Sequence, residues 1–355
     1  MEISTPRQIA IVSPGTMVRS VITYRPSVEL RRTRKPEVAY VVGGIAAELV
    51  VARSFERSGM ALNVGDGRGT RTQYASRLVR TMMRFDLQVN PGNAPWPLLA
   101  DAARAAESAG FDTFWTADHL AGEVMAAPAM PECFTTLGAL AAVTSSIRLG
   151  PLVANVANRL PVITANAAAT LQQLSNGRCV LGLGAGSAPN TKWSTERRAV
   201  GVEQPQKMAD RHRVLLDTLD VIDELWSPTR REDLRTFIAP TPRPPIVLGV
   251  NSTALARIAA QRTDGVNVRG SADYAHEVIA AAREERSVSH ARAGDAIDPF
   301  MVTVWEHFDE ALLRADVVDD RLARWQSWGV NRVILLMFRG VDLGAIERAG
   351  KHLHD

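Results

Sequence analysis

The chain has 355 residues, of which 46% are hydrophobic and 22% charged, and its formal net charge at pH 7 is +3. This composition excludes a disordered or fibrous chain and is sufficient for a large buried core in one or two domains. The two cysteines, Cys133 and Cys179, both lie in apolar runs, which excludes a disulfide framework and a cysteine-based metal site. A reducing, cytoplasmic location is expected.

Residues 1–81 differ from the remainder in charge. They hold 13 Lys and Arg against 6 Asp and Glu, whereas the remainder holds 28 against 32. A basic run precedes the apolar run 38–52, which is the order found in signal and anchor sequences. That apolar run is shorter than the roughly 20 residues that span a bilayer, and Glu48 interrupts it. We therefore predict no membrane partner and, because few aromatic residues accompany the basic ones, no nucleic-acid partner.

Met82 and Met83 stand immediately before the first convincing strand. Residues 1–81 are therefore predicted to be a basic, poorly ordered extension outside the working fold, with residues 82–355 as the functional domain. An upstream start codon that the cell does not use would produce the same pattern, and the sequence leaves both explanations open.

From residue 83 onward, strand and helix patterns alternate eight times. The predicted strands are 84–90, 111–118, 146–155, 178–186, 244–250, 264–268, 300–308 and 331–337. The helices that follow them are 95–110, 134–146, 161–177, 206–227, 252–261, 272–285, 319–329 and 343–350. Eight such pairs in this length favour a closed (β/α)8 TIM barrel over an open doubly wound sheet. The irregular stretch 230–245 is interpreted as a barrel loop.

In a TIM barrel, chemistry is located at the carboxyl ends of the strands. The stretch LGLGAGSAPN, residues 181–190, ends the fourth strand with glycines at 182, 184 and 186. It fails as a Rossmann fingerprint, because Ser187 stands where the third glycine is required and Pro189 follows. A glycine turn at a barrel mouth still presents backbone N–H groups that hold a phosphate.

Four stretches, taken in order, resemble the bacterial luciferase-like oxidoreductase superfamily. They are FDTFWTADHL, ECFTTLGALAAVTSSIRLGPLVAN, RLPVITANAAATLQQLSNGRCVLGLGAG and PPIVLGVNSTALARIAAQRTDGVNV. The resemblance implies a TIM barrel that binds FMN or the deazaflavin coenzyme F-420 at its mouth. The TADHL word and the LGLGAG turn are more similar to the F-420 branch, in which a hydride moves between the coenzyme and a small-molecule substrate.

The resemblance also implies roles for individual residues. His119 matches the catalytic histidine near the reactive carbon, and Asp118 matches a neighbour that contacts the ring or orients the histidine. The other matched residues are cofactor-binding: Val153, Ala154 and Asn155 in a bulge, often with a strained or cis peptide, Gly184, Ala185, Gly186 and Ser187 in the phosphate turn, and Gly249, Asn251 and Ser252 in a second turn.

Three departures from the family pattern limit the prediction. Ser187 replaces a glutamate of the sugar-phosphate dehydrogenases, so glucose 6-phosphate is not predicted as substrate. Val250 replaces a glycine in the second turn, which weakens the assignment of that turn. Residues 230–245 are shorter than the inserted hairpin of the family, which predicts a more open substrate pocket on that side.

Two other functions remain open on the sequence. One is an FMN-dependent monooxygenase that uses reduced flavin from a partner flavin reductase and molecular oxygen. The other is a protein that binds flavin or deazaflavin without catalysis. A homodimer is expected from the family. Among further candidates, Trp115 and Trp193 are expected in the core or at the rim, Arg197 and Arg198 in solvent, His212 on the surface, and His307 either at the mouth or buried.

Overall fold

The computed structural model describes residues 7–11, 20–24, 83–293, 300–309 and 315–354. The chain divides into two compact units. In the first, β1 (Arg7–Ile11) and β2 (Ser20–Tyr24) pair as antiparallel strands. The apolar run 38–52 and the predicted boundary at residues 81 and 82 lie outside the described residues, so the division of the chain at that point stays a prediction.

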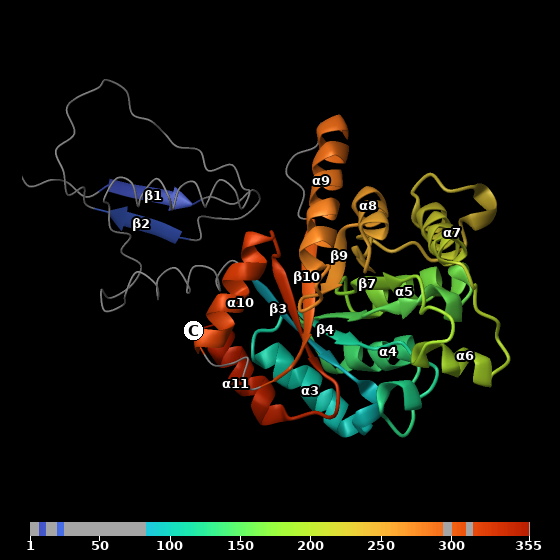
Figure 1. Ribbon diagram of the computed structural model, residues 1–355, viewed down its shortest axis with the longest axis horizontal. Helices are drawn as coiled ribbons and strands as arrows, with labels where there is room; N and C mark the ends of the chain where they lie inside the picture. Colours follow the sequence, from blue (N-terminus) through green and yellow to red (C-terminus); the bar gives the residue numbers. More distant parts are fainter. Residues whose placement is uncertain (1–6, 12–19, 25–82, 294–299, 310–314, 355) are drawn as a thin grey trace, which may run out of the picture. The chain divides into compact units, whose positions relative to one another are not determined.

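The second unit contains a parallel sheet that closes into a barrel (Figure 1). Its strands are β3 (Arg84–Val89), β4 (Thr113–Thr116), β5 (Arg148–Pro151), β6 (Ala154–Asn155), β7 (Leu181–Gly184), β8 (Ile246–Gly249), β9 (Gly265–Arg269), β10 (Met301–His307) and β11 (Arg332–Met337). Their order is β5-β4-β3-β11-β10-β9-β8-β7-β6, and all neighbours are parallel.

The two ends of this order are two parts of one predicted strand, 146–155, which is interrupted at residues 152 and 153. A parallel bridge between Leu149 and Cys179 joins β5 to the chain just before β7. The sheet therefore has eight positions around a ring, and the predicted (β/α)8 barrel is confirmed.

Helices cover the outside of the sheet (Figure 1). They are α3 (Trp96–Ser108), α4 (Cys133–Val143), α5 (Pro161–Leu174), α7 (Met208–Trp226), α8 (Thr253–Arg262), α9 (Ala275–Ala293), α10 (Ala315–Ser327) and α11 (Leu343–His354). A short additional helix, α6 (Thr195–Ala199), lies in the connection between β7 and α7 and was not predicted. No helix in the described residues combines the length and hydropathy needed to cross a membrane.

The runs 247–250 and 333–337 are apolar without alternation because both faces of their strands are buried. All six residues of β11 are buried. Inside the barrel, Trp115, Leu152, Val180, Val247 and Ile334 form one cluster. On the outer face, a much larger cluster joins the strands to the helices, and Leu87, Phe114 and Leu335 belong to it. The expectation that Trp115 belongs to the core is confirmed, since it is 1% exposed.

A buried cluster of charged side chains lies at the amino ends of the strands. Arg332, the first residue of β11, donates from Nη1 to Asp86 Oδ1 and to Asp112 Oδ2, both at 2.6 Å. Trp115 Nε1 donates to the other oxygen of Asp86 at 2.9 Å. Burial raises the pKa of Asp86, and the nearby Asp112 carboxylate raises it too, while Arg332 lowers it. The resulting pKa of Asp86 is about 6. Burial also acts on Asp112, but Arg332 outweighs it and lowers the pKa of that carboxyl.

Residues 230–245 connect α7 to β8 and form a loop within the barrel, as predicted. Gln172 Nε2 on α5 donates to the carbonyl oxygen of Pro242 at 2.7 Å, which attaches the loop to the helical layer. The loop leads into the amino end of β8, whereas the cavity lies at the carboxyl ends, and none of its residues lines that cavity. The predicted effect of its length on the openness of the pocket stays a prediction.

Candidate active site

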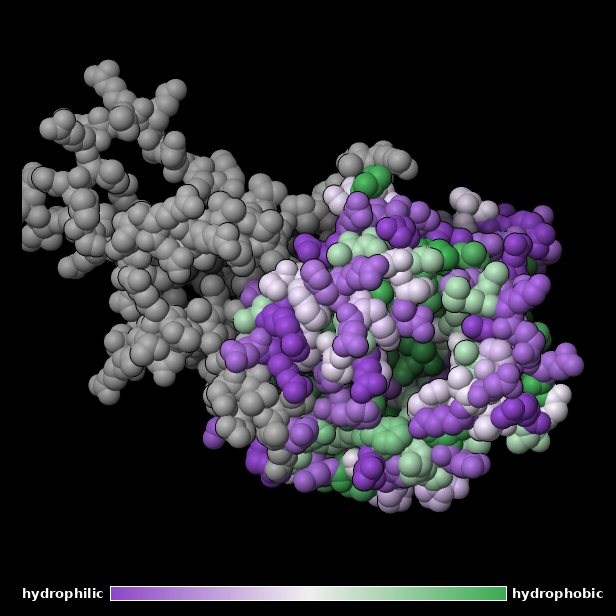
Figure 2. Space-filling model, in the orientation of Figure 1, coloured by the Kyte–Doolittle hydropathy of each residue, from purple (hydrophilic) through white to green (hydrophobic). Residues whose placement is uncertain are grey.

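A cavity of about 710 Å³ lies at the carboxyl ends of the strands. A hollow with hydrophobic residues inside and hydrophilic residues around its edge is visible in Figure 2. Ten of the twelve site residues predicted from the sequence line the cavity: Asp118, His119, Val153, Asn155, Gly184, Ala185, Gly186, Ser187, Gly249 and Asn251.

The other two predicted residues have structural positions outside the cavity lining. Ala154 is 1% exposed, and it pairs with Leu183 where β6 meets β7. Ser252 precedes α8, and its hydroxyl accepts from the Leu255 amide at 3.4 Å, which is the position of a helix N-cap.

His119 is held by a buried glutamate that the sequence did not indicate. His119 Nδ1 lies 3.1 Å from Glu196 Oε1. The other carboxylate oxygen of Glu196 accepts from the amides of Leu120 and Ala121 at 2.8 and 3.2 Å. Burial raises the pKa of Glu196, but the hydrogen bonds and charge of His119 and the two amides outweigh burial and lower it. An ionised carboxylate only accepts, so Nδ1 carries the hydrogen and Nε2 remains the nitrogen available for proton transfer.

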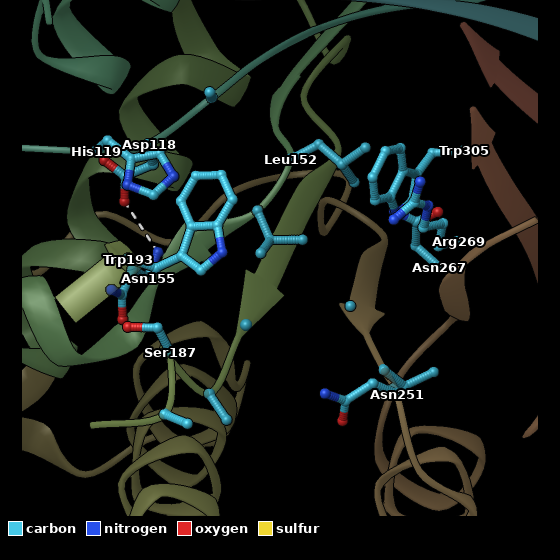
Figure 3. Close-up of a pocket in the computed structure, with 18 of the residues that line it drawn as sticks. Asp118, His119, Leu152, Asn155, Ser187, Trp193, Asn251, Asn267, Arg269 and Trp305 are labelled. Atoms are coloured by element: carbon cyan, nitrogen blue, oxygen red, sulfur yellow. Dashed lines mark hydrogen bonds between the residues drawn. The ribbon is translucent and has the colours of Figure 1, made fainter. Parts of the chain in front are cut away.

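Trp193 and Lys192 stand beside this histidine. The rings of His119 and Trp193 are stacked, with their centroids 5.6 Å apart and their planes at 30° (Figure 3). Lys192 Nζ lies 4.1 Å from the centroid of the Trp193 ring, within the range of a cation–π contact. We name His119, Trp193 and Lys192 the histidine side of the cavity.

Asp118 does not bond to His119; its partners are Arg159 and the backbone of Asn155. Asn155 N donates to Asp118 Oδ2 at 2.9 Å, and Arg159 Nη2 donates to Oδ1 at 2.7 Å (Figure 3). The same Nη2 also donates to Glu132 Oε1 at 2.6 Å. Burial lowers the pKa of Arg159, but the bonds and charge of Asp118 and Glu132 raise it above its usual value. The alternative in which Asp118 orients the histidine is corrected, since Glu196 occupies that position.

The floor of the cavity explains the glycines of the LGLGAG turn. The Leu152–Val153 peptide bond is cis, and Val153 follows it into the cavity lining. A Cβ on Gly184 would lie 2.5 Å from Val153 Cγ2, so glycine is required there unless the valine moves. Gly186 has φ +82°, in the left-handed region that favours glycine. The turn therefore brings bare backbone against Val153 and Asn155.

Arg269, Asn267 and Trp305 lie on the other side of Leu152 from His119 and Trp193 (Figure 3). Arg269 ends β9, and its guanidinium lies 5.5 Å from the centroid of Trp305 on β10. Trp305 and His307 are in edge contact at 5.7 Å, and His307 and Phe338 are in edge contact at 5.7 Å. We name Arg269, Trp305, His307 and Phe338 the arginine side.

The residues that sequence reasoning missed fall into two kinds. Arg269 directly follows the predicted strand 264–268, so the strand-end rule applied to that strand would have found it. Glu196 lies in the long connection after β7, where no periodicity or motif marks it. His212 was expected on the surface but lines the cavity, and burial and the neighbouring Arg211 lower its pKa. Arg197 was expected in solvent but is 5% exposed and donates to the carbonyl oxygens of Ala157 and Glu203.

Comparison with known proteins places this barrel in a family. The model of the family described as luciferase-like monooxygenase matches residues 78–325. A 5,10-methylenetetrahydromethanopterin reductase from Archaeoglobus fulgidus is 30% identical over 223 residues, 61% of each chain. An F-420-dependent glucose-6-phosphate dehydrogenase from Nakamurella multipartita is 33% identical over 177 residues, 47% of this chain and 50% of the relative. The matched stretches thus span half to three fifths of these curated relatives.

Solved structures share the fold at lower identity. The coenzyme F-420-dependent tetrahydromethanopterin reductase from Methanopyrus kandleri has a TM-score of 0.57 at 19% identity, covering 76% of this chain and 98% of that one. An F-420-dependent secondary alcohol dehydrogenase in complex with an F-420–acetone adduct has a TM-score of 0.60 at 17% identity, covering 77% and 99%. A monooxygenase from Streptomyces bottropensis has a TM-score of 0.58 at 17% identity, covering 77% and 98%.

Proposed function

The chain belongs to the luciferase-like monooxygenase family, and from that premise we propose that it transfers a hydride between coenzyme F-420 and a small organic substrate. The observation that carries the proposal is the His119–Glu196 pair, which borders the same cavity as the glycine turn. The relatives that are named F-420-dependent support the choice of coenzyme.

The described residues fit such a coenzyme. The cavity of about 710 Å³ has room for a tricyclic ring together with a substrate. At its edge, the backbone is bare at Gly184 and Gly186, and a side chain at Gly184 would collide with Val153. Lys192 and Arg211, both in the cavity lining, supply positive charge for an anionic chain. We assign Val153 and Asn155 to the support of the ring and residues 184–187 to the phosphate.

The coenzyme supplies the electron pair, as a hydride donor or acceptor, and the protein supplies position and proton transfer. His119 Nε2 donates a proton to the substrate oxygen when a carbonyl is reduced, or accepts one when an alcohol is oxidised. Glu196 keeps Nδ1 protonated and stabilises the imidazolium while Nε2 holds the proton. Trp193 covers one face of the imidazole and limits its contact with water.

The Asp118–Arg159 pair has a positioning role in this mechanism. Since the Asp118 carboxylate is neutralised by Arg159 and accepts from Asn155 N, it ties the end of β4 to the bulge that supports the ring. The Asp118 carboxylate therefore positions the backbone of the bulge through charge-assisted hydrogen bonds.

The test is a pair of titrations of the purified protein, one with F-420 and one with FMN, followed by their absorbance and fluorescence. We expect saturable binding of F-420 at one site per chain and weaker binding of FMN. His119→Ala is expected to lower turnover with a reactive substrate by about 100-fold to 10⁴-fold while it leaves F-420 affinity within a few-fold. Tight FMN binding without F-420 binding would contradict the proposal.

A second candidate is an FMN-dependent monooxygenase that works with a flavin reductase. The family description and the shared fold of the Streptomyces bottropensis monooxygenase favour it. Consumption of oxygen and substrate in equal amounts, with FMN and a reductase present, would establish it. The relatives that are named F-420-dependent are 28–33% identical to this chain, which makes F-420 the first choice.

A further inference from the structure

The arginine side of the cavity has no part in the mechanism above, and its Arg269 and Trp305 lie across Leu152 from His119 and Trp193 (Figure 3). We infer that the substrate is a small ring-containing or conjugated monocarboxylate, whose carboxylate binds Arg269 and whose apolar body contacts Trp305 and Phe338. This inference rests on the proposed function and names the substrate class of the same site.

Arg269 is an exposed residue of the cavity lining that has no acid beside it among the described residues. Arg159 and Arg332 each contact two carboxylates, and so does the more exposed Arg262. Arg269 donates from Nε to Ser271 Oγ at 3.2 Å, and within the described ranges no carboxylate lies within 4.0 Å of its guanidinium. Its two terminal nitrogens therefore remain as a planar pair of donors, the geometry that binds a carboxylate with two hydrogen bonds.

The surroundings of Arg269 select a flat, singly charged partner. Trp305 lies 5.5 Å from the guanidinium and continues through His307 to Phe338 in edge contacts, which gives an apolar aromatic surface. Asn267 Oδ1 accepts from Thr303 Oγ1 at 2.8 Å, which leaves the Asn267 amide nitrogen as a neutral donor. One guanidinium with neutral donors matches a monoanion better than a dianionic phosphate.

The charge of the whole cavity agrees with an anionic ligand. Among the residues that line it, Lys192, Arg211 and Arg269 are cationic and Asp118 is the acidic one, already paired with Arg159. Arg211 donates to the carbonyl oxygens of Pro205 and Gln206, next to Gln204, which contacts Ser187. Arg211 therefore belongs with the phosphate turn, Lys192 lies over Trp193 on the histidine side, and Arg269 is left for the substrate.

The experiment uses full-length protein loaded with F-420 and two probes of the same shape, benzoate and benzamide, titrated by ligand-observed NMR. Benzoate is expected to bind at least tenfold more tightly than benzamide. Arg269→Gln should weaken benzoate binding about tenfold, because a charge-assisted pair is lost, and should leave benzamide unchanged. Trp305→Leu should weaken benzoate about threefold or more. Arg257→Gln, the same charge change at an exposed residue of α8 outside the cavity, is the control.

The outcomes separate this inference from the proposed function. F-420 loading is measured first by the coenzyme's own fluorescence, and failure to load overturns the proposed function and the inference with it. If F-420 binds but benzoate binds no better than benzamide, or if Arg269→Gln and Arg257→Gln behave alike, the inference is overturned while the proposed function stands. Thermal unfolding of each variant checks that a loss of binding is not a loss of fold.

Discussion

The two ends of the barrel use the same residue types in opposite ways. At the amino ends of the strands, Arg332 binds two carboxylates, Asp86 and Asp112. At the carboxyl ends, acids are few, and Arg269 has none within ion-pair distance among the residues described. At the amino ends the charge of Arg332 is neutralised by the two carboxylates, whereas at the carboxyl ends Arg269 presents its charge to the cavity.

The comparison shows which arginines stabilise the fold and which are free to bind. A buried charge without a partner is costly, so the Arg332 cluster must be complete before the barrel is stable. An arginine at the mouth keeps part of its hydration, so it has a low desolvation cost when no ligand is bound. Asp118 and Arg159 lie between the two cases, since they are at the mouth but are paired like the amino-end cluster. The following variants test that distinction.

The largest expected effect is that of Arg332→Met. It leaves Asp86 and Asp112 buried without their cation, and we expect a loss of about 3–5 kcal/mol of unfolding free energy at pH 8, measured by urea denaturation. The loss should be smaller at pH 5, where Asp86 takes up a proton. The control is Arg84→Met, which removes an exposed partner of the same Asp112, 3.6 Å away, and should cost less than about 1 kcal/mol. Equal losses for the two variants would show that the buried cluster contributes no more to stability than the exposed ion pair.

The next effect concerns the cavity floor. Gly184→Ala places a methyl group 2.5 Å from Val153 Cγ2, and the resulting overpacking should cost about 1–3 kcal/mol of stability and weaken F-420 binding. Combining it with Val153→Ala removes the colliding group. The double variant should therefore be more stable than the sum of the two single losses predicts, in a double-mutant cycle. Strict additivity would contradict the assignment of the glycine to this contact.

Glu196→Gln tests the positioning of His119 at the mouth. The amide keeps the shape of the side chain but loses the charge that stabilises the imidazolium, so turnover should fall about tenfold or more, as for other groups that act by orienting a histidine. The KM for substrate and the Kd for F-420 should stay within about twofold, and Glu196→Asp should recover part of the turnover. A Gln variant that loses F-420 binding in proportion to turnover would indicate a purely structural role.

The smallest expected effect is a pH dependence at the amino end. The pKa of Asp86 in the folded protein, about 6, is above its ordinary value of 3.8, so the folded state binds more protons between these limits. The contribution of Asp86 to stability is therefore fully present below pH 3.8 and is lost as the pH rises through 6. Relative to Asp86→Asn, which does not titrate, wild type should lose stability from pH 4 to pH 7. Parallel curves of unfolding free energy against pH for the two proteins would contradict the raised pKa of Asp86.

Much of the site was predictable because a TIM barrel converts chain order into position. A residue that directly follows a strand reaches the mouth, and this rule located His119, Asn155, Ser187 and Asn251 from the sequence. It would also have located Arg269. The rule does not reach residues within long connections, so it missed Glu196. It also does not show which neighbour a side chain contacts, so Asp118 was considered as the residue that orients His119, a position that Glu196 occupies.

The sequence by itself determined the eight strand–helix pairs, the glycine turn and the end of the barrel at which the cavity lies, because these follow from local periodicity and from the order of elements. Only the tertiary structure decided the ion pairs: that Glu196 holds His119, that Arg159 takes Asp118, and that Arg269 is left without an acid. These pairs join residues up to 77 positions apart, and their formation depends on how the connections pack above the barrel, which no local pattern encodes.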